Sequence, residues 1–173
     1  MLNKKYVKCM NSENGFQTNV WGAPMWLCLH LISLNYKPEM KKGYKQFFNS
    51  LQYVLPCGAC RRNYSYHINN TLPLTDNALK CRKSMSMWVF FLHNAVQRSI
   101  FIKTQDIHDK PKYEDTTSDF TKAMAFYESF RAKCCKTSHG CTVPLKGSRK
   151  RSKIHIVKFS KPRKANAIKN SSK

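Results

Sequence analysis

Residues 40–57 read MKKGYKQFFNSLQYVLPC, and this stretch decides the fold. Its apolar side chains recur at intervals of three and four residues, at Met40, Tyr44, Phe47, Phe48, Leu51, Val54 and Leu55. That spacing places them on one wide stripe of a helix. Pro56 then ends the helix, because the residue before a proline is pushed out of the helical region. The sequence therefore predicts an amphipathic helix that stops directly before Cys57.

Helices are also predicted on both sides of this stretch. Upstream, helical spacing predicts a helix from about Pro24 to Asn35, with Met25, Trp26, Leu29, Ile32 and Ser33 on one face. Downstream, three more are predicted from Cys57 to Asn70, around Met85, Trp88, Val89, Leu92, Val96 and Ile100, and around Phe120, Met124, Tyr127, Phe130 and Cys134. No stretch alternates as a strand would. The predicted fold is all-α, a four-helix bundle with a short fifth helix.

Length and charge suggest one domain with tails. A chain of 173 residues suffices for one core. We expect an N-terminal arm over 1–18, a helical domain over 19–136 and a disordered basic tail over 137–173. The chain holds 31 Lys and Arg against 9 Asp and Glu, a net charge of +22, and residues 146–173 hold 11 Lys or Arg and no acid. Such a tail either binds nucleic acid or an acidic partner or is simply solvated, and its basic runs also fit nuclear targeting.

The expected cellular compartment bears on the role of the eight cysteines. Residues 1–11 lack the apolar segment of a secretory signal, and no later stretch is apolar over a membrane's width. We therefore expect a soluble protein that is not exported and has no membrane span. In reducing compartments cysteines seldom form structural disulfides, so redox or metal chemistry is favoured.

Cys57 and Cys60 form the only Cys-x-x-Cys of the chain. The first turn of a helix offers unpaired N–H groups and the positive end of the helix dipole, which favour a thiolate, as do the neighbouring Arg61 and Arg62. Zinc remains an alternative, because the pair is also half of a zinc knuckle whose second half could come from Cys134, Cys135, His139 and Cys141. A thioredoxin fold is disfavoured, since it needs strands.

Three motifs in order resemble those of the Erv/ALR family of flavin-linked sulfhydryl oxidases. The first is Trp21-Gly-x-x-x-Trp26-x-x-Leu29-His30, with Tyr36 where the family often has a tyrosine. The second is Pro56-Cys57-Gly-Ala-Cys60, and the third is Trp88-x-x-x-x-His93-Asn94-x-Val96-Gln97. The resemblance spans roughly Val20 to Phe130.

The resemblance implies that residues 19–136 form an FAD-binding sulfhydryl oxidase domain. Cys60 would lie next to the flavin and Cys57 would exchange with the substrate. Electrons would pass from a protein dithiol through the pair to FAD and O2, giving H2O2. The family's cofactor contacts carry over to Gly22, Trp26, His30, Tyr36, His93, Asn94 and Gln97. Trp88 is expected in the core.

Some positions depart from the family pattern. Gln97 stands in place of a second asparagine, and Lys103 lies one residue beyond the usual lysine position, where it could serve as a cofactor contact. The family's stapling cysteines near the last helix are missing in their usual form. Cys134, Cys135 and Cys141 could form another staple or a shuttle pair, and Cys9 is a second shuttle candidate. Cys28 and Cys81 are expected to be plain thiols, with Cys28 buried.

The resemblance also concerns setting and assembly. The Trp-Gly form of the first motif, with the Lys- and Asn-rich composition, is similar to oxidases of large cytoplasmic DNA viruses. That implies a cytoplasmic location, in host cytoplasm or in virions, and the family generally forms homodimers. The rival hypothesis is a basic, zinc-containing nucleic-acid-binding protein without enzymatic activity.

Overall fold

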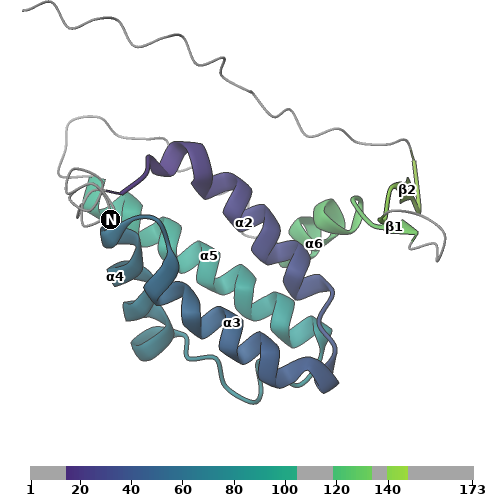
Figure 1. The fold of residues 1–173 in the computed structure, drawn as a ribbon, viewed down its shortest axis with the longest axis horizontal. Coiled ribbons are helices and arrows are strands. Elements are labelled where there is room, and N and C mark those ends of the chain that lie inside the picture. The colour runs from purple at the N-terminus through teal and green to yellow at the C-terminus, as the bar shows by residue number, and fades with distance from the viewer. Residues whose placement is uncertain (1–14, 105–118, 134–139, 148–173) are drawn as a thin grey trace, which may run out of the picture. The chain divides into compact units, whose positions relative to one another are not determined.

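The computed structural model describes residues 15–104, 119–133 and 140–147. The chain divides into two compact units, with the break between Arg131 and Ala132. The first holds α2 (Thr18–Leu34), η1 (Pro38–Met40), α3 (Lys41–Val54), α4 (Gly58–Tyr66), η2 (His67–Thr71), α5 (Arg82–Thr104) and α6 (Phe120–Glu128) (Figure 1). In the second, β1 (Ala132–Lys133) pairs antiparallel with β2 (Val143–Pro144).

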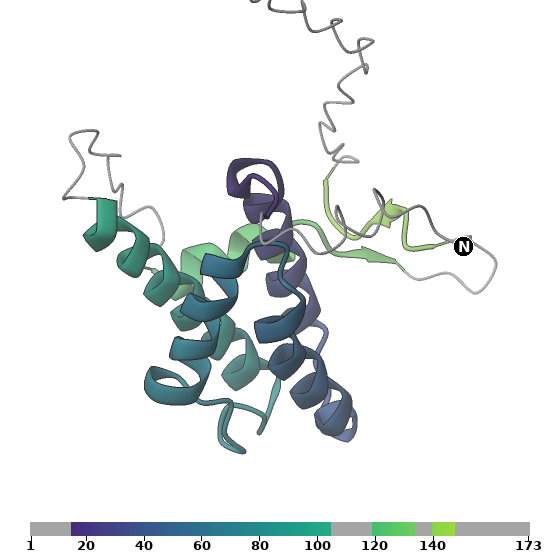
Figure 2. The same cartoon turned by 60° about the vertical axis from the view of Figure 1, so that its left-hand side comes forward.

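The predicted bundle is confirmed by the packing of the helices. α2 packs on α5, α3 packs on α4, and α4 also contacts α5. α6 is the short fifth helix, and it lies against α2 (Figure 2). Its ring contact with α5 joins Phe90 and Phe120, whose centroids are 5.5 Å apart in an edge-on arrangement.

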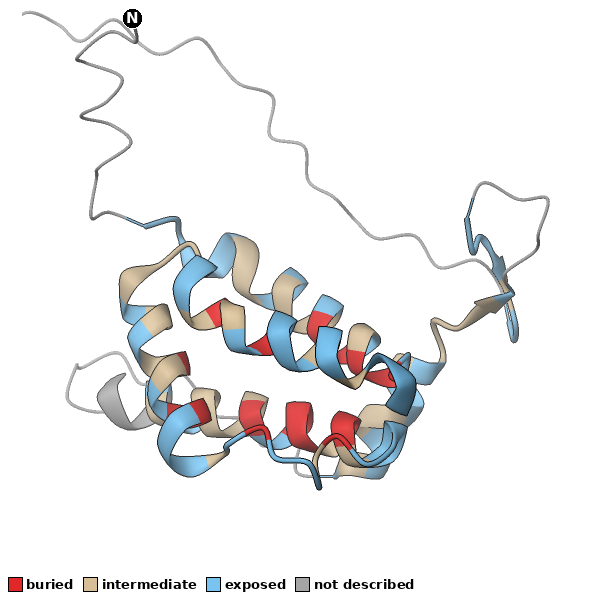
Figure 3. Ribbon diagram, turned by 60° about the horizontal axis from the view of Figure 1, so that its bottom comes forward, coloured by how far each residue is buried: buried red, intermediate tan, exposed pale blue. Residues whose placement is uncertain are grey.

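The core lies between α2, α3, α4 and α5, where the buried positions of the helices face inward (Figure 3). Phe48 of α3 meets Trp88 of α5 edge-on at 5.4 Å, and both are buried. The indole of Trp88 donates to the Leu72 carbonyl at 3.0 Å, which satisfies its N–H inside the core. Trp88 is therefore a core residue, as predicted.

The α3 prediction is confirmed, but its buried face is narrower than its apolar stripe. Leu55 has an extended backbone ahead of Pro56, so the helix ends at Val54. Phe48, Leu51 and Leu55 are buried, whereas Val54 is 65% exposed. Met40 and Phe47 are exposed as well, because the neighbouring helices cover only part of the stripe.

α2 begins six residues before the predicted start at Pro24. The proline lies inside the helix, in its second turn, rather than at its first position. The extra turn is held by the indole N–H of Trp21, which donates to the Phe16 carbonyl at 3.1 Å. Pro24 donates no backbone hydrogen bond, so the turn before it depends on the other bonds of the helix and on this indole contact.

The other predicted helices differ from the observed ones in where they begin and end. The predicted helix 57–70 is α4 followed by the π-helical turn η2. A hydrogen bond of 2.9 Å between His67 Nε2 and Ser99 Oγ connects this turn with α5. α5 extends past both predicted limits, and Ile100 is 52% exposed rather than buried. α6 ends at Glu128, short of Cys134. The two-residue strands β1 and β2 were not predicted, since they are too short to show alternation.

Several predictions fall outside the described residues. They concern the loop 105–118, residues 1–14, Cys134, Cys135, His139 and the chain beyond residue 147. The boundaries of the arm, domain and tail stay predictions. None of the helices in the described ranges combines the length and apolarity needed to cross a bilayer.

Candidate active site

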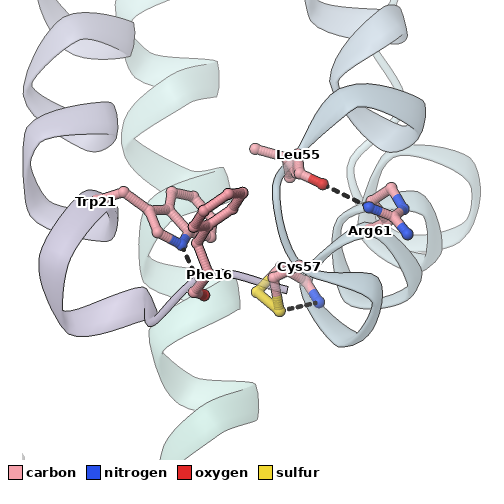
Figure 4. Close-up of a disulfide and its surroundings, with 6 residues drawn as sticks. Phe16, Trp21, Leu55, Cys57 and Arg61 are labelled. Atoms are coloured by element: carbon pink, nitrogen blue, oxygen red, sulfur yellow. Dashed lines mark hydrogen bonds between the residues drawn. A yellow bond between two sulfur atoms is a disulfide. The ribbon is translucent and has the colours of Figure 1, made fainter. Parts of the chain in front are cut away.

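Cys57 and Cys60 form a disulfide at the start of α4, with their Cα atoms 5.1 Å apart (Figure 4). Cys57 is the N-cap residue, and its sulfur accepts a hydrogen bond from the backbone N–H of Cys60 at 3.2 Å. The Cys57 carbonyl accepts from Arg61 N at 2.9 Å and closes the first turn. The same N–H that contacts the sulfur in the disulfide remains available to a thiolate after reduction.

The two cysteines have different surroundings, although both are partly buried. Cys60 packs against the core cluster, and one turn later Tyr64 is buried with its hydroxyl donating to the Phe48 carbonyl at 2.8 Å. Cys57 precedes α4 with an extended backbone and caps it.

A short strap formed by residues 15–17 passes beside the disulfide. Phe16 N donates to the Pro56 carbonyl at 2.8 Å, and Trp21 fixes the carbonyl of Phe16 (Figure 4). A Cβ on Gly15 would lie 2.7 Å from Pro56 O and 2.8 Å from Cys57 Cα, so only glycine permits this approach. The strap places the chain entering α2 against the redox turn.

A cluster of four rings joins α2, α5 and α6. Trp26 stacks on His93 with centroids 4.2 Å apart, and Tyr127 stacks on His30 at 4.3 Å. Nε2 of His30 and Nδ1 of His93 are 3.0 Å apart and share a hydrogen bond. Trp26 also packs against the same core cluster as Cys60. Two of the predicted sequence motifs thus meet in space.

Burial keeps both histidines neutral. Desolvation, with a smaller contribution from His93, lowers the pKa of His30 from 6.5 to about 3. Desolvation lowers the pKa of His93 from 6.5 to about 4. Among the described residues, buried Nδ1 of His30 has no hydrogen-bond partner. A neutral imidazole has one donor and one acceptor nitrogen, so this atom can take a hydrogen bond of either sense according to tautomer.

The remaining predicted contacts fall into three groups. Asn94 and Gln97 are partly buried on α5 near His93, and the Gln97 amide lies 3.2 Å from His93 Nε2. Gly22 has open space where a Cβ would point. Lys103 is in the last turn of α5.

Tyr36 differs from the other predicted contacts. It is buried, meets Tyr44 edge-on at 4.9 Å and donates its hydroxyl to the Leu79 carbonyl at 2.6 Å. Tyr36 is therefore part of the core, and its contact with the cofactor stays a prediction.

Two parts of the site were not predicted. Tyr127 was assigned to the stripe of the last helix and not to the site, yet it stacks on His30. Phe16 and the strap were assigned to the N-terminal arm, although Phe16 bonds to Pro56. The glycine before Phe16 was the available signal for a close backbone approach.

The cysteines outside the pair behave differently from one another. Cys28 is a free, exposed thiol, so its predicted burial is wrong; the buried face of α2 is formed by Leu29, His30, Ser33 and Leu34. Cys81 is also free and exposed, and hydrogen bonds from Ser84 lower its pKa. Cys141 is disulfide-bonded.

The zinc alternative gains no support from the described residues. Cys57 and Cys60 are joined to each other, so neither sulfur is a thiolate ligand in this state. In residues 15–104, 119–133 and 140–147, no three His, Cys, Asp or Glu side chains gather as a metal site.

Comparison with known proteins agrees with this geometry. The model of the Erv1 / Alr family matches residues 23–118, more than half of the chain. The chain belongs to the Erv1/Alr family. The matched range contains the redox pair, His30 and His93 but not the strap.

A viral protein is similar to this Erv1/Alr chain. The probable FAD-linked sulfhydryl oxidase of Acanthamoeba polyphaga mimivirus is 44% identical over 80 residues, which cover 44% of this chain and 55% of that protein. The chain thus matches about half the length of its curated relative. The similarity to a protein of a large DNA virus is as predicted.

Proposed function

We propose that this Erv1/Alr chain is an FAD-dependent thiol oxidase that forms disulfide bonds in protein substrates. The observation that carries the proposal is the Cys57–Cys60 disulfide across the first turn of α4, in which Cys57 caps the helix and Cys60 packs against the core cluster. The family match and the viral relative's name support the same activity.

The position of the two sulfurs assigns their roles in thiol exchange. A substrate thiolate attacks Cys57 Sγ, which forms a mixed disulfide and releases Cys60 as a thiolate. A second substrate thiolate then attacks the substrate sulfur of the mixed disulfide and releases Cys57. The substrate gains a disulfide, its two thiol protons pass to solvent bases, and the cysteine pair holds two electrons. The Cys60 N–H at Cys57 Sγ stabilises the departing Cys57 thiolate.

The ring cluster has the chemistry that a flavin nucleotide needs. Trp26 and Tyr127 supply aromatic surface, and the neutral His30 has an unsatisfied buried nitrogen. Neutral donors and acceptors suit an uncharged heteroaromatic ring, because they need no counterion in a desolvated site. The open space at Gly22 would permit a close backbone approach. The residues present therefore fit FAD.

The residues that would hold FAD are Gly22, Trp26, His30, Tyr36, His93, Asn94, Gln97 and Lys103. When bound, FAD supplies the two-electron acceptor that restores the Cys57–Cys60 disulfide, with O2 as the final acceptor and H2O2 as the product. Tyr36 supports this site through the core, because its hydroxyl is engaged by Leu79. Cys60, on the core side of α4, is the thiolate that faces the cofactor.

The proposal extends to partners and setting. The substrates are protein dithiols and O2. Exposed apolar residues on α2, such as Val20 and Leu31, support a homodimer. The basic residues 146–173 bind nucleic acid or an acidic partner, and the viral relative favours host cytoplasm or the virion as the location.

Oxygen consumption with dithiothreitol tests the activity. Wild-type protein loaded with FAD is expected to consume O2 and release an equal amount of H2O2. Cys57→Ser and Cys60→Ser should each lower the rate by at least about a hundredfold, because either change prevents the intramolecular disulfide. Cys28→Ser is the matched control and should retain wild-type turnover. Full activity in either active-site variant would refute the proposal.

A further inference from the structure

A polar groove lies along α4 next to the redox turn. Its volume is about 380 Å³, and it is lined by Gln52, Arg61, Arg62, Ser65, Tyr66 and Asn69. We propose that this groove, called the basic groove below, binds an acidic segment of the protein whose thiols Cys57 oxidises. The inference rests on the proposed function and specifies the class of substrate.

The groove follows one face of the chain beyond the redox turn. Arg61, Ser65 and Asn69 succeed one another at intervals of four residues, and all three line it. The end formed by Arg61 and Arg62 is the end nearest the redox turn in the chain, so a peptide that lies in the groove would start beside that turn.

Two guanidinium groups converge on the start of α4. Measured from the Cβ position of Gly58, Nη2 of Arg61 is 3.6 Å away and Nη1 of Arg62 is 3.7 Å away. Gly58 lies between the two cysteines in sequence, so both positive charges are near the redox turn. Like charges held close together repel, and an anion between them relieves that repulsion.

In the part of the chain that the structure describes, neither arginine forms an ion pair with a carboxylate. Residues 40–75 contain five Lys or Arg and no Asp or Glu. Among the described residues, the ion pairs join Lys41 to Asp76, Lys122 to Asp119 and Arg131 to Glu128. The positive charge of the groove is therefore available to a partner.

The groove is arranged to accept a peptide. Arg61 Nη1 donates to the Leu55 carbonyl at 2.7 Å, which fixes this guanidinium with one of its five donors. Ser65 Oγ donates to Gln52 Oε1 at 3.0 Å, and Asn69 Nδ2 donates to the Ser65 carbonyl at 2.9 Å. These bonds orient amide and hydroxyl groups along the wall, where they can pair with a peptide backbone.

This arrangement predicts selectivity by charge. A carboxylate near a substrate cysteine would be drawn to Arg61 and Arg62 and so bring its thiolate to Cys57 Sγ. Electrostatic attraction of this kind acts mainly on association and specificity. A small neutral dithiol does not reach into the groove and gains nothing from it.

The test compares substrates and charge-reversed variants of the FAD-loaded protein. Two synthetic peptides carry the same cysteine pair, one flanked by glutamates and the other by glutamines. Arg62 is chosen because it is exposed, whereas Arg61 also supports Leu55. Arg62→Glu is expected to lower kcat/KM for the acidic peptide about tenfold, mainly through KM. Because Arg62 also favours the thiolate of the redox pair, oxidation of dithiothreitol reports that shared effect. The ratio of kcat/KM for the acidic peptide to kcat/KM for the glutamine peptide should still fall about fivefold.

Lys42→Glu is the matched control, since it makes the same change in net charge. Lys42 is exposed on α3, ten residues before Gln52, which is roughly 15 Å along a helix that rises about 1.5 Å per residue. This variant should retain the preference for the acidic peptide, and Arg62→Lys should retain most of it. The preference should weaken in about 0.5 M salt, where charges are screened within a few ångströms.

Binding separates failure of the groove from failure of the enzyme activity. A fluorescent acidic peptide with serines in place of cysteines should bind wild type more tightly than Arg62→Glu, as measured by anisotropy, whether or not the protein turns over. Equal binding of acidic and glutamine peptides would overturn the proposal. So would an equal loss with all substrates in Arg62→Glu, or Arg62-dependent binding of a short oligonucleotide in place of the peptide. Binding without any dithiol oxidation would leave the groove intact and refute the oxidase.

Discussion

Cys57 and Cys60 are separated by less than one helical turn but have different surroundings. Cys60 contacts the core cluster, whereas Cys57 caps α4 and lies under the strap. Thiol exchange needs one sulfur that a substrate can reach and one that can leave toward the acceptor. We propose that these surroundings give Cys57 the first of these roles and Cys60 the second.

The buried histidines predict a pH-dependent stability. The pKa values of His30 and His93 are about 3 and about 4, against 6.5 for an unburied histidine. Between these values the unfolded chain binds more protons than the folded one. The free energy of unfolding should therefore rise with pH from about 4 to about 6.5 and then level off. Thermal unfolding of the flavin-free protein across this range measures the effect.

His93→Gln isolates the contribution of the ring cluster. Asp76 and Glu128 also have lowered pKa values and add a slope at more acidic pH, so the difference between variant and wild type is the useful quantity. Glutamine retains a hydrogen-bonding group beside His30 but does not titrate. The variant should show a shallower slope between pH 4 and 6.5. An identical slope would mean that His93 is protonated in the folded state.

The sequence predicted individual site residues unevenly. His30 and His93 could be identified because the family motifs mark them, and the structure brings them within 3.0 Å. Tyr127 and Phe16 carry no such mark, since their roles arise from contacts with distant parts of the chain. Tyr36 also lies at a motif position, but the motif does not reveal that its hydroxyl donates to the Leu79 carbonyl.

At the scale of elements, the junction between α3 and α4 positions the chemistry. Pro56 ends one helix, Cys57 caps the next, and the strap bonds to the Pro56 carbonyl between them. The strap thereby connects the start of α2 to the redox turn.

Gly15→Ala tests the strap. The added Cβ would meet backbone atoms of Pro56 and Cys57 at 2.7 and 2.8 Å, so the strap has to lift away. Loss of the Phe16 N–H to Pro56 hydrogen bond should cost about 0.5–1.5 kcal/mol of stability. The Cys57–Cys60 disulfide should also be reduced faster by a small dithiol, because the strap no longer lies beside it. Chemical denaturation and stopped-flow reduction measure the two effects.

Gly43→Ala is the matched control for this change. Nothing lies within 4 Å of its Cβ position, and it is exposed inside α3. Alanine is the better helix former there and should raise stability by about 0.5–1 kcal/mol without altering reduction. If both alanine variants behaved alike, the strap contact would be refuted.

Helices were predictable because apolar periodicity and Pro56 act locally. The helix ends were harder to predict. In α2, a start at Pro24 was favoured because prolines are common at the first helical position, whereas the helix begins at Thr18 and contains the proline. Burial was also only partly predictable. The apolar stripe of α3 includes Val54, but the stripe does not show which of its residues the neighbouring helices cover, and Val54 is exposed.

At the scale of the whole molecule, the densest positive charge of the sequence lies outside the part of the chain that holds the site. The site and the family match fall within residues 15–131, whereas residues 148–173 hold ten Lys or Arg and no acid. A chain with this distribution can bind polyanions without using its active site.

Deletion of residues 148–173 tests this separation. Oxidation of dithiothreitol should be unchanged, and stability should stay within about 0.5 kcal/mol of wild type. Salt-sensitive binding to nucleic acid, if the tail provides it, should fall sharply, because such binding depends on the number of phosphate contacts. Loss of dithiothreitol oxidation in the truncated protein would contradict the separation.

The most direct test of the central claim is the visible spectrum of the purified protein during anaerobic addition of dithiothreitol. We expect a yellow protein with bound flavin whose colour bleaches rapidly as electrons pass through Cys57 and Cys60. Cys60→Ser should bind the flavin but bleach far more slowly. A colourless protein that takes up no FAD, or a Cys60→Ser variant that bleaches as fast as wild type, would contradict that claim.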